Sequence, residues 1–273
     1  MKKLSITTVF GSAVLCLLYL PIGVVIANAF NDSDTLGKWG GFTLRWFAAV
    51  AHNDRVLRDF RLSMAVAVVA TGVALLIAVA TGLATRHMAQ RPKAWVEIST
   101  LVRIILPEVV IAVGLFLLMR WMSLPLGFVA IVIGHVVFLS AYATVIVQAR
   151  FAALTDVLEE AAADLGASPW RTFRRVTLPG LLPAIVVAAL LSFTFSFDDV
   201  VTSMFLGGAK IETLPVLILG LVRIEVSPFV NAVAVAVMAI NLIALSLVAF
   251  SSSLRAVAGV AEPLPNTVDS DKD

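Results

Sequence analysis

Glu160-Ala161-Ala162-Ala163-Asp164-Leu165-Gly166 lies in a polar segment, residues 148–180, that separates two long apolar runs of the chain. Apolar residues recur there at i, i+3, i+4 and i+7: Leu158, Ala161, Ala162 and Leu165. This spacing predicts a short helix with a narrow apolar stripe. The small alanines let another surface approach the helix backbone closely. Such a helix, held in water between two membrane spans, indicates a docking surface.

The same segment carries signals for helix ends. Asp156 and Glu159 have the spacing of a capping box, which predicts a helix start. Gly166 stands where a helix ends in a left-handed turn. Ser168-Pro169 offers a serine N-cap and a proline at the first position of a second helix. We expect Leu178-Pro179 to end that second helix, after which the next membrane span begins.

The composition places the chain among polytopic membrane proteins. It has 273 residues, of which 60% are hydrophobic and 14% charged, and its mean hydropathy is +1.00. A soluble domain of this size could not bury so much apolar surface. The single cysteine, Cys16, excludes an internal disulfide. The net charge of +2 does not indicate nucleic-acid binding, because the basic residues lie at the ends of apolar runs.

Six apolar runs are long enough to cross a bilayer, which takes about 20 helical residues. They are residues 4–29, 62–83, 99–120, 126–147, 181–206 and 229–252. The first run could belong to a signal peptide cleaved after Ala27-Asn28-Ala29, but it exceeds the usual length of about 7–15 residues, which favours a retained span. We therefore predict an all-α integral membrane protein with six transmembrane helices.

Basic residues in short loops predict the orientation. The loops at 86–93 and 171–175 are rich in Lys and Arg, which places them in the cytoplasm together with both termini. We expect one transmembrane domain over residues 1–255. It would include an outer loop at 30–61 and the cytoplasmic loop at 148–180, and residues 256–273 would form a short disordered tail.

The outer loop carries Trp46, Phe47 and Val50 at helical spacing. This pattern predicts a short helix lying in the membrane interface. A docking surface for a partner is the alternative.

Three acidic residues lie within predicted spans, where ionisable groups are costly and commonly functional. Glu108 follows Pro107, which should kink its span toward a cavity. Asp198 and Asp199 lie late in the fifth span, and adjacent helical residues cannot both face one lumen squarely. For each of the three acids a structural role is the alternative. For the two aspartates this means an ion pair with Arg103, Arg120 or Arg223, or capping of a helix.

On a continuous helix Thr194, Phe195, Asp198 and Thr202 would share one face. A carboxylate beside an aromatic ring suits an organic ammonium ion, through charge pairing and cation–π attraction. His135, in the fourth span, is predicted to be a hydrogen-bonded packing residue. A proton relay is the alternative.

The pattern E-A-A, three residues, G, with a downstream L-P, resembles the EAA loop of ABC importer permeases. The resemblance implies a type I importer fold in which a coupling helix seats on a partner ATPase, and it gives that coupling role to Glu160, Ala161, Ala162 and Gly166. Arg171, Arg174 and Arg175 could pair with ATPase carboxylates; anionic lipid or simple anchoring is the alternative.

The chain has no G-x-x-x-x-G-K-[ST] phosphate loop, since Gly207-Gly208-Ala209-Lys210 lacks the spacing. The implied ATP and Mg²⁺ sites therefore belong to partner subunits, and the chain needs no cofactor or metal of its own. We expect a transport subunit rather than an enzyme.

From about residue 20 to residue 250 the chain also resembles spermidine/putrescine permeases of the PotC type. The motifs that carry this resemblance are residues 192–199, Leu214-Pro215, Val226-Ser227-Pro228, Asn231-Ala232, Gly41-Phe42-Thr43 with Trp46, and Pro107-Glu108 with Val110. Glu108 departs from the aspartate that the family often has there, so its carboxylate reaches further.

This resemblance implies a sister permease of the PotB type, two PotA-like ATPases and an extracytoplasmic PotD-like binding protein. It also implies a substrate pathway that includes Glu108, Thr194, Phe195, Asp198 and Asp199. The alternatives are an importer of another small solute and a proton-coupled secondary transporter that uses Glu108, Asp198 and His135. An intramembrane enzyme is disfavoured, because the chain lacks H-E-x-x-H and a convincing nucleophile–base pair.

Overall fold

The computed structural model describes residues 6–34, 37–154, 157–209 and 211–259, and this part of the chain is helical apart from loops and one isolated bridge between Asn31 and Phe42. The helices are α1 (Ile6–Ala29), α2 (Arg45–Ala51), α3 (Asp54–His87), α4 (Gln90–Ile105), α5 (Glu108–Trp121), α6 (Phe128–Ala153), α7 (Val157–Asp164), α8 (Pro169–Thr172), the π-helix η1 (Phe173–Thr177), α9 (Leu178–Phe197), α10 (Val201–Leu206), α11 (Leu214–Ile224) and α12 (Pro228–Gly259). The predicted all-α class is confirmed.

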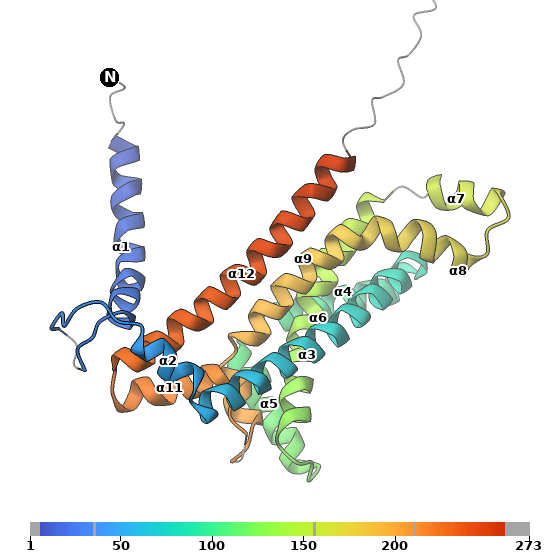
Figure 1. Ribbon diagram of the computed structural model, residues 1–273. Helices are drawn as coiled ribbons and strands as arrows, with labels where there is room; N and C mark the ends of the chain where they lie inside the picture. The colour runs from blue at the N-terminus through green and yellow to red at the C-terminus, as the bar shows by residue number, and fades with distance from the viewer. Residues whose placement is uncertain (1–5, 35–36, 155–156, 210, 260–273) are drawn as a thin grey trace, which may run out of the picture.

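The centre of the molecule is formed by α3, α6 and α9, which pack side by side (Figure 1). Small residues line this contact: Ala74 and Ala78 of α3 and Ala143 of α6 are completely buried. At Gly82 of α3 an added Cβ would collide with the ring of Phe151 on α6. Small side chains let membrane helices approach closely where the hydrophobic effect gives no preference for helix over lipid.

Four helices of the described residues are long and apolar enough to span a membrane, namely α1, α3, α6 and the stretch Pro169–Phe197. A fifth span is formed if α4 and α5, which meet at 105°, are taken together. α12 is 32 residues long, and its described apolar part is Pro228–Ile243. The predicted number of six spans stays a prediction.

The third predicted span, residues 99–120, is not one helix. The helix is interrupted between Ile105 and Glu108, and the axes of α4 and α5 meet there at a bend of 105°. The residue before a proline avoids the helical region, and here Leu106 is extended (φ −62°, ψ 132°). The kink predicted from Pro107 is therefore confirmed, in a much sharper form than an ordinary bend.

The fifth predicted span, residues 181–206, is also not continuous, because α9 ends at Phe197 and α10 begins at Val201. At its other end the predicted stop at Leu178-Pro179 is wrong. α8 continues through η1 into α9, with Pro179 in the first turn of α9. Pro is tolerated there because the first-turn N–H has no partner within its helix, and the π turn changes the hydrogen-bond register just before it.

α1 stands apart from the central helices and packs against α12 (Figure 1). Its apolar side chains are largely exposed on this chain, as expected for a surface that faces lipid or another subunit. Helix α12 continues to Gly259, past the predicted domain end at residue 255. The rest of the predicted tail lies outside the described residues.

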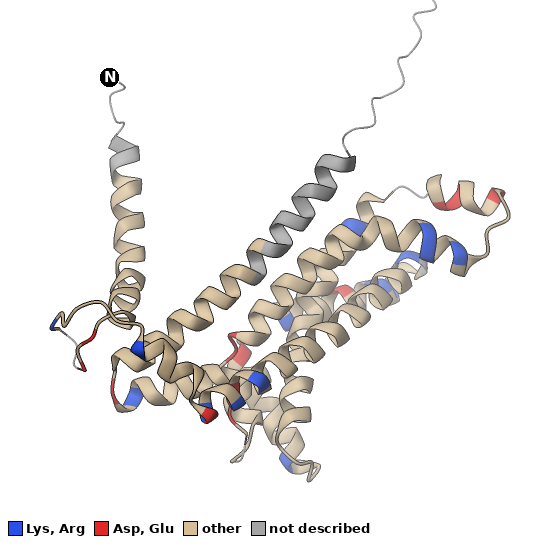
Figure 2. Ribbon diagram, viewed as in Figure 1, with Lys and Arg blue, Asp and Glu red and all other residues tan. Residues whose placement is uncertain are grey.

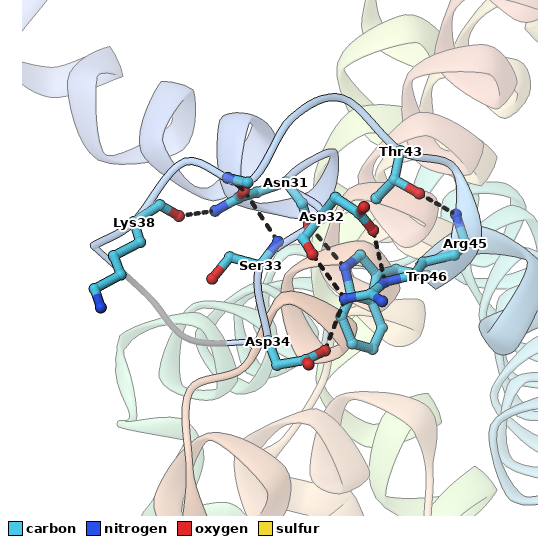
Figure 3. A network of polar contacts seen from close by, with 9 residues as sticks. Asn31, Asp32, Ser33, Asp34, Lys38, Thr43, Arg45 and Trp46 are labelled. Atoms are coloured by element: carbon cyan, nitrogen blue, oxygen red, sulfur yellow. Dashed lines mark hydrogen bonds and ion pairs between the residues drawn. The ribbon is translucent and has the colours of Figure 1, made fainter.

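The outer loop is a folded unit rather than a loose connection (Figure 3). The buried side chain of Asn31 organises it: its Nδ2 donates to the Lys38 carbonyl at 2.7 Å, and its Oδ1 accepts from the Ser33 and Gly40 amides. A short polar side chain thus replaces the backbone partners that the loop would otherwise lack.

The predicted short helix around Trp46 is confirmed as α2, which packs against α12. Arg45 forms ion pairs with Asp32 at 3.0 Å and Asp34 at 2.7 Å and lies over the Trp46 ring (Figure 3). The Trp46 indole N–H donates to the Asn31 carbonyl at 2.8 Å. α2 is therefore fixed to the loop before it. The position of its outer face in the membrane interface stays a prediction, with docking of a partner as the alternative.

Candidate substrate cavity and coupling surface

Two helix breaks meet at one place in the bundle. The first, at Leu106-Pro107, puts Glu108 in the first turn of α5. The second, between Phe197 and Val201, leaves Asp198 and Asp199 outside regular helix. Irregular backbone at membrane depth is tolerated where it is covered by protein or lines a cavity. The breaks thus allow carboxylates from two distant parts of the sequence to approach each other.

Asp199 is buried and caps α10. Its Oδ1 accepts from the Ser203 amide at 2.8 Å, and its Oδ2 accepts from the Thr202 amide at 3.3 Å. A carboxylate near a helix N-terminus also interacts favourably with the helix dipole. The predicted alternative of helix capping is therefore confirmed for Asp199. In the described part of the chain, neither aspartate forms an ion pair with Arg103, Arg120 or Arg223.

His135 joins α6 to this capped turn. Its side chain is 0% exposed, with Nδ1 2.6 Å from Ser196 Oγ and Nε2 3.0 Å from Asp199 Oδ1. The structure confirms that His135 is a buried, hydrogen-bonded residue. The choice between a packing role and a proton relay stays a prediction. The partners of His135 were not predicted, since Ser196 and Asp199 lie more than sixty residues away in sequence.

The Thr202 hydroxyl donates to Glu108 Oε1 at 3.2 Å and thereby joins α10 to α5. Thr202 was expected on one helical face with Thr194, Phe195 and Asp198. That part of the prediction is wrong, because α9 ends at Phe197 and Thr202 belongs to the separate helix α10. The i, i+4 spacing of one continuous helix therefore does not extend to Thr202.

A cavity of about 550 Å³ lies beside the two breaks. Its walls contain all five predicted pathway residues, Glu108, Thr194, Phe195, Asp198 and Asp199. The structure brings these residues together, and their role stays a prediction.

Asp198 is exposed in this cavity and Asp199 is mostly covered, in line with the expectation that adjacent acids cannot both face a lumen squarely. Asp198 Oδ1 accepts from Asn241 of α12 at 3.1 Å, a partner that the sequence did not indicate.

Aromatic rings and one cation complete the cavity. Phe195 meets Tyr142 edge to face, with ring centroids 5.4 Å apart. Arg103 also lines it but donates to Ser140 Oγ at 2.8 Å and to the Val137 carbonyl, which directs its charge toward α6. The cavity wall contains three acidic side chains and one arginine, so acidic groups outnumber basic ones. Carboxylates beside aromatic rings suit an organic cation.

We call the polar segment at residues 148–180 the elbow, and its turn at Gly166 has the geometry that the sequence predicts. Gly166 adopts φ +79°, in the left-handed region. Its amide donates to the Ala163 carbonyl at 2.8 Å, and the Ala167 amide donates to the Ala162 carbonyl at 2.9 Å. These two bonds form a Schellman motif that ends α7.

The second elbow helix starts at Pro169, as predicted, but the side chain of Ser168 makes no capping hydrogen bond. The predicted capping residue Asp156 lies outside the described residues.

The elbow presents uncovered apolar side chains. Leu158 is 61% exposed and Leu165 is 89% exposed, and Trp170 of α8 is exposed as well. Glu160 is exposed beside them. Charged residues gather at the two ends of the bundle, around α7 and α8 at one end and α2 and α11 at the other, with largely uncharged helices between (Figure 2). An apolar stripe in this polar region is typical of an interaction site.

Comparison with known proteins gives the class. Residues 74–255 match the family described as binding-protein-dependent transport system inner membrane component. The match covers more than half of the chain, and the chain belongs to this family. It is thus an inner membrane component of an ABC transport system.

Individual relatives agree with this class. The chain is 35% identical over 234 residues to the spermidine/putrescine transport system permease protein PotC of Escherichia coli K12, covering 86% of this chain and 89% of that protein. It is 33% identical to the putrescine transport system permease protein PotI of the same organism, over 80% of each chain. A solved bacterial ABC transporter involved in alginate import has a chain that superposes with a TM-score of 0.64 at 13% identity, covering 90% of this chain and 94% of that one. That likeness supports the fold.

Proposed function

We propose that this chain is a permease subunit of an ATP-driven importer of polyamines such as spermidine and putrescine. The observation that carries the proposal is the cavity in which Glu108, Asp198 and Asp199 converge from two broken helices. The names of the PotC and PotI relatives support the same substrate class.

Polyamines are flexible chains of methylene groups that carry several ammonium charges. Exposed Asp198 would pair with one ammonium group, and Phe195 and Tyr142 would contact the chain and its charge through their rings. Glu108 is a second exposed carboxylate in the same wall. Asp199 is held by His135 and by two backbone amides. It would therefore attract the ammonium groups through its charge more than through direct contact.

The proposed complex contains a sister permease, two ATPase subunits that bind ATP and Mg²⁺, and an extracytoplasmic binding protein. The exposed stripe of α7 supports an ATPase docking site on the elbow. Closure of the ATPases around ATP would move α7, and the spans would change the side on which the cavity opens. The chain itself performs no covalent step. Both termini would lie in the cytoplasm.

The deciding experiment is uptake of radiolabelled putrescine and spermidine into proteoliposomes that contain the co-purified complex, with binding protein added outside. We expect uptake that needs ATP and the binding protein and that persists when the proton gradient is collapsed. ATPase activity stimulated by the binding protein without amine uptake would refute the polyamine assignment alone. Uptake driven by a proton gradient without ATP would refute the importer and favour the secondary transporter.

A further inference from the structure

The carboxylate of Glu159 connects α7 to two other elements of the cytoplasmic side. Arg86 Nη1, in the last turn of α3, donates to Glu159 Oε1 at 2.8 Å. The hydroxyl of Thr177, at the end of η1, donates to the same oxygen at 2.6 Å. α3 and the helix that continues into α9 are therefore joined to α7 through one acidic side chain. We call Glu159, Arg86 and Thr177 the α7 junction.

The α7 junction is partly shielded from water. The side chain of Arg86 is 15% exposed and that of Glu159 is 27% exposed, and Thr177 is buried. The Arg86 guanidinium also lies over the ring of buried Phe151 on α6, 5.4 Å from its centroid. Charge-assisted hydrogen bonds are stronger than neutral ones, and shielded pairs are weakened less by salt. The junction thus differs from an ordinary surface ion pair, which contributes little.

The surroundings of α7 make this link consequential. The large apolar side chains of α7, Val157 and Leu158, are exposed, so packing against the rest of the described chain does little to hold the helix. A cavity of about 710 Å³ lies between α7 and the ends of α3, α4 and α6, lined by Glu97, Lys93 and Gln148 among others. The Glu159 carboxylate reaches across to one edge of this space. A helix that stands over an open cavity can move relative to α3 unless polar links prevent it.

Glu159 and Glu160 have different surroundings although they are adjacent. Successive residues of an α-helix point about 100° apart. Glu160 is exposed, and Glu159 is directed toward Arg86 and Thr177. Glu160 is therefore available to a partner, whereas Glu159 forms its contacts within the permease itself.

We propose that the α7 junction transfers displacement of α7 to α3 and α9, with Glu159, Arg86 and Thr177 acting as positioning residues that do not contact the ATPase. This inference rests on the proposed function, because it assumes that a partner moves α7. Without the junction the partner would still bind α7 and hydrolyse ATP, and α3 and α9 would follow its movement less.

The test measures two quantities in proteoliposomes that contain the co-purified complex: amine imported per ATP hydrolysed, and the amount of ATPase bound to the permease. Glu159→Gln and Arg86→Gln are expected to lower the transport-to-hydrolysis ratio about fivefold or more, with ATPase still bound in wild-type amount. Arg86→Lys keeps the charge and should retain most of the ratio. Thr177→Val, which removes one neutral hydrogen bond, should lower the ratio by about twofold, and Thr177→Ser should preserve it.

The matched control is Glu97→Gln. Glu97 lines the same cavity, but its carboxylate lies 4.0 Å from Lys93 of the same helix and, among the described elements, joins no second one. We expect the wild-type ratio from this variant. A wild-type ratio in Glu159→Gln, Arg86→Gln and Thr177→Val would overturn the proposal.

Loss of bound ATPase in these variants would also overturn the proposal, since Glu159 would then act in docking. If Glu159→Gln fails to assemble, Thr177→Val decides between these outcomes. A wild-type complex that retains no ATPase, or imports no amine, would instead refute the proposed function.

Discussion

Asp198 and Asp199 are adjacent in the sequence and differ in what surrounds them. Asp199 receives hydrogen bonds from two backbone amides and faces His135. Asp198 is exposed in the cavity and has Asn241 as a partner. A carboxylate with several fixed donors contributes to the local structure, whereas an exposed one is free to exchange partners with a ligand. The two residues therefore make different predictions on substitution.

Asp198→Asn should lower amine uptake about tenfold or more and leave basal ATP hydrolysis nearly unchanged. The substitution keeps the shape of the side chain but removes a negative charge that contributes about 1.4 kcal/mol or more to the free energy of amine binding. Uptake and ATP hydrolysis are measured on the same proteoliposomes. A rise in the amine concentration needed for half-maximal uptake would locate the effect in binding. Equal loss of uptake and of hydrolysis would instead indicate a structural role.

His135→Ala should destabilise the protein by about 2–4 kcal/mol, because it leaves a cavity and removes a hydrogen bond from buried Asp199. His135→Gln should cost less, since an amide can still donate. Thermal unfolding of the detergent-solubilised protein measures both. His52 of the outer loop is exposed, so His52→Ala is the control and should change the midpoint little. Equal midpoints for the two alanine variants would contradict the packing role.

At the scale of elements, helix ends decide where function is placed. The chain leaves the helical conformation at Leu106-Pro107 between α4 and α5, after Phe197 between α9 and α10, and at the turn of Gly166 that follows α7. The first two breaks bring carboxylates to one cavity, and the third turns the chain so that α7 presents its apolar stripe. At Pro107 and Gly166 a local backbone rule, and not packing alone, fixes the position of a neighbouring candidate functional residue.

Gly166→Ala should weaken binding of the ATPase about fivefold, because a left-handed conformation costs a residue with a Cβ about 1 kcal/mol or more and the end of α7 would rearrange. Co-purification or titration with the ATPase subunit measures the effect. Gly220→Ala in α11 is the matched control. Gly220 has open space around it and no positive φ, so the wild-type affinity is expected. Gly166→Asn should bind the ATPase with an affinity between those of Gly166→Ala and of the wild type, since Asn tolerates the left-handed conformation. Unchanged binding by Gly166→Ala would mean that the turn does not position the stripe.

At the scale of the whole molecule, the chain has the surfaces of one part of a larger assembly. α1 stands apart from the central helices (Figure 1), and its apolar side chains are exposed. The elbow lies in a region rich in charged residues (Figure 2), and the apolar stripe of α7 is exposed there. The family to which the chain belongs is a component of binding-protein-dependent transport systems. Lipid and other subunits are expected to cover these surfaces.

Glu160→Ala should leave the spans folded and reduce transport about tenfold, by weakening ATPase docking or coupling. Glu160 is exposed, and within the described residues it forms no hydrogen bond or ion pair with a buried group, so its loss should not destabilise the fold. Expression, thermal stability and ATP-dependent uptake of the complex are compared with those of Glu97→Ala, an exposed acid on α4. Normal uptake by the Glu160 variant would remove the coupling role from the motif.

The all-helical class, the helix around Trp46, the turn at Gly166 and the kink at Pro107 were predictable, since each depends on apolar periodicity or on the conformational limits of Gly and Pro. The continuity of residues 181–206 was predicted wrongly. Hydropathy averaged over a span does not register the break after Phe197, because only Asp198 and Asp199 interrupt the apolar run, which resumes at Val200. The stop at Leu178-Pro179 failed because a proline in a first helical turn is compatible with a helix that continues.

The sequence by itself determined that this is a helical membrane protein, because a run of about 20 apolar residues has few alternatives to a membrane helix. It also determined the turn at Gly166, because few residues other than glycine readily adopt a positive φ. Only the tertiary structure decided which polar groups meet. His135 with Asp199, Glu108 with Thr202, and Arg86 with Glu159 are pairs separated by 64, 94 and 73 residues. Their meeting depends on how α3, α5, α6, α7 and α10 pack and bend, and sequence spacing carries no information on contacts between different helices.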